Sequence, residues 1–155
     1  MVETDLLYAY IKKEDWLKPV AENIIAKIMK GEFGLVYASR ESLHEIYYVS
    51  KEEGITLDEI VSRAAALTDL ENLVFLDTTY EVELLALVLM IQFNLNFIFD
   101  AYYASTALNQ VPDHTIISTD TIFDKIPGIR RVDHLDYESF ICITLISPRF
   151  VVIFP

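Results

Sequence analysis

The sequence predicts a three-layer α/β/α fold with a mostly parallel central sheet, and two observations support this prediction. Short apolar runs at residues 35–38, 73–76 and 115–118 have the length of buried strands, and helical patterns follow each of them. Strands that alternate with helices form largely parallel sheets with helices on both faces. At 155 residues, the chain is long enough for one domain of this kind and too short for two of ordinary size.

Six helices are expected along the chain, and several begin at a residue that can cap a helix. They span residues 6–13, 16–28, 39 or 42 to 51, 57–67, 79–93 and 100–109. Asp15 can cap the second helix, in which Trp16 begins an apolar face with a spacing of four residues. Thr56 and Glu59 form a capping box for the fourth. The fifth helix is apolar nearly all round from Leu84, which predicts that it is buried.

The two ends of the chain are less regular. Val2 begins a short first strand, and Arg131 begins a last strand after a helical turn that follows Asp120. Residues 135–155 contain no motif that we can place. We therefore divide the chain into a domain at residues 1–134 and a C-terminal extension at residues 135–155. The extension is an extra strand pair, a dimerisation element or a disordered segment.

The composition indicates a soluble protein of the cell interior. Cys142 is the only cysteine, so no internal disulfide can form, and a reducing, cytoplasmic setting is expected. The longest uninterrupted apolar run before the extension is residues 84–91, far short of the roughly 20 residues that span a membrane. We therefore expect no membrane association.

Acidic residues outnumber basic residues by 24 to 12, which gives a formal net charge of −12. This balance argues against broad electrostatic capture of nucleic acid, which relies on basic patches. It does not exclude a nuclease, because a bound metal ion reverses the sign of the charge at its own site.

Acidic residues fall at four places where a strand pattern gives way to a helix pattern. They are Glu3 with Asp5, Glu45, Asp100 and Asp120. Because a doubly wound fold gathers the carboxyl ends of its strands at one edge, we expect these side chains to meet there. Carboxylates that meet repel one another unless a hard divalent cation such as Mg²⁺ or Mn²⁺ lies among them. Such a site suits hydrolysis of phosphodiester bonds.

Each of these acids also has a plainer interpretation. Asp100 lies in the first turn of an apolar helix, where the helix dipole stabilises an acid by about 0.3–1 kcal/mol. Asp120 can bond its own backbone in an ordinary turn, and Glu45 can lie on a solvated helix face. A non-catalytic binding or regulatory module, in which the acids are caps and surface charge, is therefore the main alternative.

A receiver-like phosphoacceptor domain is a second alternative, because such domains also carry acids at strand ends. Asp77 directly follows the strand at residues 73–76. However, the strand at residues 115–118 is followed by no lysine until Lys125, so this alternative is weak.

Other side chains fit core or surface roles better than catalytic ones. The three histidines, His44, His114 and His134, lack metal-ligand spacing, which makes a zinc site improbable. The pairs Tyr47-Tyr48 and Tyr102-Tyr103 can stack on bases, but aromatic residues at helical positions more often pack in the core.

Four short segments, taken in their order and spacing, resemble a known family. They are Val2-Glu-Thr-Asp-Leu-Leu7, Ser42-Leu-His-Glu45, Phe99-Asp-Ala-Tyr-Tyr-Ala104 and Ser118-Thr-Asp120. Together, residues 2–133 look like the PIN-domain nucleases, in particular the VapC-type toxin ribonucleases of prokaryotic toxin–antitoxin pairs. The resemblance implies a Mg²⁺- or Mn²⁺-dependent endoribonuclease that hydrolyses RNA. It also implies a homodimer and a cognate antitoxin whose tail occupies the site.

The resemblance implies roles for individual acids. Glu45, Asp100 and Asp120 match the family's acidic positions without substitution, and Ser118 matches a small hydroxyl residue near the site. We expect Asp100 to be a direct metal ligand. Glu45 and Asp120 would act directly or through water, since Mg²⁺ commonly keeps several of its waters.

The N-terminal motif departs from the family pattern. The family's first strand normally ends in Asp-Thr-(Asn/Ser), which falls here on Glu3-Thr4-Asp5. Glu3 replaces the first acid with a longer one, and Asp5 stands where a neutral polar residue is usual. Either Glu3 or Asp5 can therefore supply the N-terminal metal ligand and share in catalysis, with Thr4 as a supporting polar residue.

Overall fold

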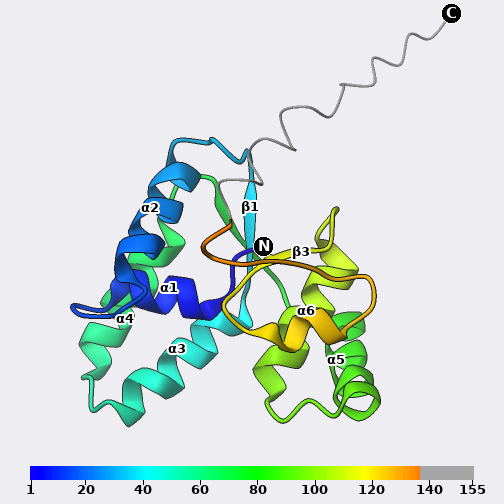
Figure 1. The fold of residues 1–155 in the computed structure, drawn as a ribbon. Coiled ribbons are helices and arrows are strands. Elements are labelled where there is room, and N and C mark those ends of the chain that lie inside the picture. Colours follow the sequence, from blue (N-terminus) through cyan, green and yellow to red (C-terminus); the bar gives the residue numbers. More distant parts are fainter. Residues whose placement is uncertain (137–155) are drawn as a thin grey trace, which may run out of the picture.

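The computed structural model describes residues 1–136 and places helices on both faces of a small parallel sheet (Figure 1). The strands are β1 (Val36–Ser39), β2 (Leu73–Leu76), β3 (Thr115–Ile117) and β4 (Arg130–Val132). β1 pairs with β2 and β3 pairs with β4, and both pairs are parallel. Val2 forms bridges to Ala38 and to Ile117, so that the N-terminus joins the two strand pairs. The predicted first strand is thus a single bridging residue.

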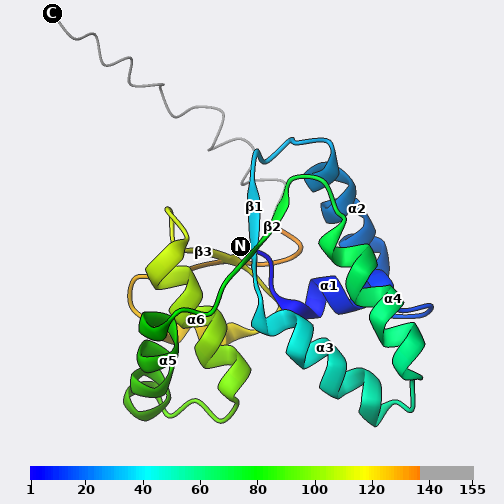
Figure 2. The same ribbon diagram turned by 180° about the vertical axis from the view of Figure 1, so that it is seen from behind.

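The helices form two layers around these strands. They are α1 (Thr4–Ile11), α2 (Lys18–Met29), α3 (Glu41–Glu52), α4 (Leu57–Thr68), α5 (Tyr80–Phe93) and α6 (Ile98–Gln110), with a 3-10 helix, η1 (Thr121–Lys125). Figures 1 and 2 show α1 to α4 on one side of the strands and α5 and α6 on the other. The three-layer α/β/α arrangement predicted from the sequence is confirmed.

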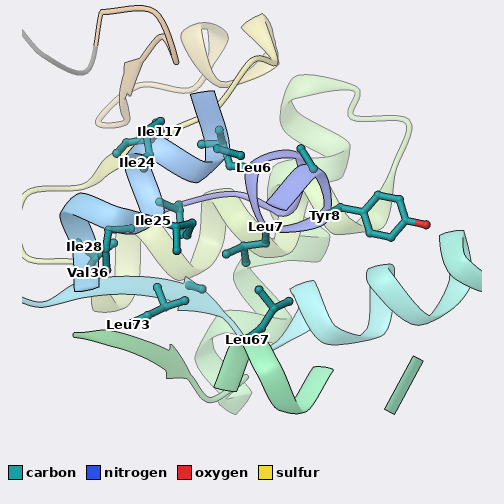
Figure 3. Close-up of a cluster of buried hydrophobic side chains, with 14 of the residues drawn as sticks. Leu6, Leu7, Tyr8, Ile24, Ile25, Ile28, Val36, Leu67, Leu73 and Ile117 are labelled. Carbon is teal, nitrogen blue, oxygen red and sulfur yellow. The ribbon is translucent and has the colours of Figure 1, made fainter. Parts of the chain in front are cut away.

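Two hydrophobic clusters fill the spaces between the layers, and the strands contribute alternate residues to each. Val36, Ala38 and Ile117 face the cluster formed with α1 to α4, which Figure 3 shows in close-up. Tyr37 and Ile116 face the cluster formed with α5, α6 and η1. This alternation is the period-two pattern of a strand that is covered on both faces.

The predicted helix starts are accurate where a side chain caps the first turn of the helix. Thr56 accepts a hydrogen bond from the Glu59 amide at 3.4 Å, which confirms the predicted start of α4. Thr79 accepts one from the Val82 amide, also at 3.4 Å, and α5 begins at the next residue, Tyr80.

The prediction that Trp16 lies on the apolar face of the second helix was wrong. The Asp15 carboxylate accepts the amide hydrogen of Leu17 at 2.9 Å, but α2 begins only at Lys18. Pro19 lies in the first turn of α2, where its fixed φ suits a helix start. Trp16 therefore belongs to the loop between α1 and α2, and 76% of its surface is exposed.

The prediction that the fifth helix is buried was also wrong. α5 buries Val82, Ala86 and Leu89, and it packs chiefly against α6. Large apolar side chains on its other side are exposed, namely Tyr80, Leu84, Leu87, Val88 and Ile91. A helix sequence that is apolar all round is compatible with burial inside one chain and with an apolar face left exposed on its surface. The sequence does not distinguish the two.

Two further expectations concern membranes and the C-terminus. Within residues 1–136 no single helix is long and apolar enough to cross a membrane, and α5 and α6 meet that test only as a pair bent by 116°. The predicted extension, with Cys142, lies outside the described residues from residue 137 onward.

Candidate functional site

The acids singled out in the sequence come from four elements. Glu3 precedes α1 as its N-cap residue, and Asp5 lies in its first turn. Glu45 belongs to α3, Asp100 to the first turn of α6, and Asp120 caps η1 after β3. The negative charges of Asp5, Glu45 and Asp100 all act on Glu3, and those of Asp120 and Glu45 act on Asp100. The structure therefore brings all five carboxyl groups into one electrostatic cluster.

Glu3 is the most deeply buried of these acids, with 7% of its surface exposed. Ser118 donates a hydrogen bond to its carboxylate, and the amide of Asp120 in turn donates to the Ser118 hydroxyl at 2.8 Å. Burial raises the pKa of Glu3 well above its usual range, and repulsion from Asp5 raises it further. Ser118, predicted to lie near the site, thus contacts Glu3, one of the candidate metal ligands.

Asp5 is held by donors from two segments. Its carboxylate accepts hydrogen bonds from the Thr119 amide at 2.8 Å, from the Thr119 hydroxyl at 2.5 Å and from the Leu6 amide at 2.6 Å. These bonds favour the ionised form, as does the charge of His134, but burial outweighs them and raises the pKa of Asp5.

The carboxylate of Asp100 has no hydrogen-bond partner among the described residues. The N-cap of α6 is Phe97, which offers no side-chain cap. Burial, together with repulsion from Asp120 and Glu45, raises the pKa of Asp100 to about 6. A capping aspartate would accept a backbone N–H and have a depressed pKa, so the capping interpretation does not describe Asp100. Asp120, in contrast, does cap η1, accepting the Ile122 amide hydrogen at 2.8 Å.

Tyr103 positions Glu45, a role that the sequence analysis missed. Its hydroxyl donates to the Glu45 carboxylate at 2.5 Å and lies 2.5 Å from the Thr4 hydroxyl. The ring is fully buried, and burial raises the pKa of Tyr103 well above its usual range, so the phenol stays protonated. The available signal was spacing, because Tyr103 follows Asp100 by three residues and shares its helix face.

A small cavity of about 160 Å³ opens beside these groups, lined by Glu3, Thr4, Asp5, Tyr8, Glu45 and Val49. Among residues 1–136, no three Asp, Glu, His or Cys side chains adopt an arrangement that would hold a metal ion. The carboxylates of Glu3, Asp5 and Glu45 instead accept hydrogen bonds from the hydroxyl groups of Ser118, Thr119 and Tyr103. The set nevertheless fits a hard divalent cation, because its ligands are all oxygen and their mutual repulsion raises the pKa values of Glu3 and Asp100.

The chain belongs to the PIN domain family, since the family model matches residues 1–129. A similar fold occurs in the crystal structure of VapBC2 from Rickettsia felis bound to a DNA fragment from their promoter. The TM-score is 0.63 and the identity 17%, over 86% of this chain and 98% of that chain. A comparison with curated proteins finds no match. Family membership confirms the resemblance noted in the sequence, and PIN domains are generally nucleases.

Proposed function

We propose that this protein is an endoribonuclease that hydrolyses RNA phosphodiester bonds with Mg²⁺ or Mn²⁺. The observation that carries the proposal is the cluster of acids from four remote segments. Burial raises the pKa values of Glu3, Asp5 and Asp100, and repulsion from neighbouring acids raises those of Glu3 and Asp100 further. A protein gains no stability from such an arrangement, and groups with perturbed pKa values gather at functional sites.

In this proposal Asp100 and either Asp5 or Glu3 are direct metal ligands, and Glu45 and Asp120 act directly or through water. When bound, the cation would lower the pKa of a water molecule and offset charge on the scissile phosphate. The chain's own hydroxyl groups orient the acids. Tyr103 fixes Glu45, and Thr119 fixes Asp5. Outer hydrogen bonds of this kind hold ligands in place in metal sites generally.

We also propose that the protein is the toxin of a toxin–antitoxin pair and that the folded domain spans residues 1–134. The support is the family and the fold shared with a chain of the VapBC2 structure. A cognate antitoxin would inactivate the enzyme by covering the acidic cluster. Co-purification of the full chain with the product of a neighbouring reading frame tests this role, and unhindered cleavage by that complex would contradict it.

The exposed face of α5 supports a homodimer. Tyr80, Leu84, Leu87, Val88 and Ile91 form one apolar stripe, and 86% of Ile91 is exposed. A stripe on one helix can pack against its own copy about a two-fold axis. We expect Ile91→Glu to shift the protein to monomer, measured by light scattering after size exclusion. Ala66→Glu, which adds the same charge to an exposed position on α4, should leave the mass unchanged; a wild-type monomer would contradict the proposal.

The direct test of activity is incubation of the pure protein with mixed RNA in Mn²⁺ or in EDTA. We expect cleavage only with the metal. Cleavage that persists in EDTA, or that is equal in wild type and Asp100→Asn, would remove the enzyme proposal and leave a non-catalytic binding or regulatory module.

Loss of the Tyr103 hydroxyl should weaken catalysis without abolishing it. We expect Tyr103→Phe to reduce cleavage by roughly 10-fold, as for other groups that orient a metal ligand. It should lower the free energy of unfolding by about 1 kcal/mol, because a buried hydrogen bond is lost. Tyr102→Phe is the matched control, since it changes the neighbouring phenol. Equal rates for the two variants would show that Glu45 needs no fixed orientation.

A further inference from the structure

Trp16 is the only tryptophan of the chain and is largely solvent-exposed, at 76%. An indole normally contributes to stability by burying a large apolar area, which Trp16 does not do here. Exposed aromatic rings that are spared from the core commonly serve as contacts for a partner.

The ring contacts a histidine whose charge acts on the acidic cluster. Trp16 packs edge-on against His134, with ring centroids 5.7 Å apart and planes at 82°. His134 is 8% exposed, and its charge acts on Asp5. His134 therefore links the exposed indole to the neighbourhood of a candidate metal ligand, and 76% of Trp16 remains exposed.

The surroundings of Trp16 are charged rather than apolar. Lys12, Lys13 and Lys18 are three of the chain's twelve basic residues and lie within seven positions. Lys12 and Lys18 form ion pairs with nearby acids, whereas Lys13 has none among the described residues. Trp16 and Lys13 border a surface hollow that Glu14, Asp15 and Glu22 also line.

We infer that Trp16 is a stacking platform for a nucleobase of single-stranded RNA whose neighbouring phosphate reaches the acidic cluster. The inference rests on the proposed ribonuclease function and names a contact for its substrate. With a net charge of −12, the protein has few cations with which to hold RNA. Stacking on an aromatic ring supplies affinity that does not depend on net charge and accepts any base.

RNA fits this position better than a protein segment. A helix from a partner needs a continuous apolar strip, which α5 offers and the loop at residues 12–17 does not. The loop instead offers one open ring on which a base can stack, with Lys13 beside it for a phosphate, in a hollow that Glu14, Asp15 and Glu22 also line.

Because Trp16 is the only tryptophan, its fluorescence reports on this position alone. The probe is a short oligouridine added in EDTA to the full chain carrying Asp100→Asn, in which cleavage should be negligible. We expect saturable quenching, and little quenching by an oligonucleotide of the same length that lacks bases. Equal quenching by both would show that the indole senses phosphate or a distant change, and would overturn the inference.

Kinetics with active protein provide the second measurement. Trp16→Leu should raise KM by about 10-fold with little change in kcat, because stacking binds substrate and transition state alike. Trp16→Phe keeps a ring and should recover most of the loss. An unchanged KM in Trp16→Leu overturns the stacking role while leaving the ribonuclease proposal intact. If Trp16→Leu loses only antitoxin binding, the ring serves a protein partner and the inference is overturned. If the wild type cleaves no RNA, both proposals fail.

Discussion

Asp100→Asn is expected to reduce metal-dependent RNA cleavage by roughly 100-fold or more, the usual cost of removing one preorganised electrostatic group. The substitution keeps the shape of the side chain and removes its charge. The Asp100 carboxylate makes no hydrogen bond among the described residues, so the loss of its charge should not disturb α6. The measurement is the initial rate of cleavage at saturating Mn²⁺.

The matched control for this variant is Asp58→Asn. Asp58 also lies in the first turn of a helix, α4, but it is exposed and remote from the acids of the cluster. Any general effect of removing an acid from a helix start should be the same in both variants. If Asp58→Asn lost as much activity as Asp100→Asn, the special role of Asp100 would be refuted.

The second large effect concerns stability, pH and metal. The pKa of Asp100 rises from 3.8 to about 6 on folding, so between these values the folded protein binds more protons than the unfolded chain. The contribution of Asp100 to the free energy of unfolding is therefore fully present below pH 3.8 and is lost as the pH rises through about 6. Glu3 and Asp5, whose pKa values are also raised, act in the same direction.

Other carboxylates lose their stabilising effect on acidification, which is the opposite pH dependence. The test is therefore the difference in stability between wild type and Asp100→Asn. The pKa values of Glu53 and Asp133 are lowered by their hydrogen bonds, and their contributions are lost on acidification. We expect metal-free Asp100→Asn to be more stable than wild type at pH 7 by about 1 kcal/mol, allowing for solvent screening. The difference should vanish near pH 4. Urea unfolding at several pH values measures it.

Divalent metal should make wild type more stable than Asp100→Asn, the reverse of their order without metal. At about 100 times its dissociation constant, an ion that binds only the folded state adds about 2.7 kcal/mol. Mn²⁺ should therefore stabilise wild type by this amount at pH 7 and Asp100→Asn much less. If Asp100→Asn were less stable than wild type without metal, Asp100 would stabilise the fold. That result would contradict the proposal that the acidic cluster destabilises the metal-free protein.

Much of the fold was predictable because its signals are local. Thr56 and Thr79 cap helices through bonds to residues three positions away, and Leu73–Leu76 is a strand with the predicted bounds. The errors at Trp16 and α5 concern which apolar residues face solvent. That outcome depends on what other elements cover them, and no local pattern contains this information.

The five acids were singled out because strand topology places the ends of parallel strands together, and their role in a site stays a prediction. The groups that orient them were not found, because their partners are remote in sequence. Tyr103 contacts Glu45 across 58 positions, and Thr119 contacts Asp5 across 114. Such pairings follow from packing rather than from any spacing along the chain.

The measurement that tests the central claim most directly is a calorimetric titration of the full chain with Mn²⁺ at pH 7, in wild type and in Asp100→Asn. We predict binding to the wild type that weakens by at least about 10-fold in the variant. Equal affinity in the two proteins, or no binding to the wild type, would contradict a cation site among these acids.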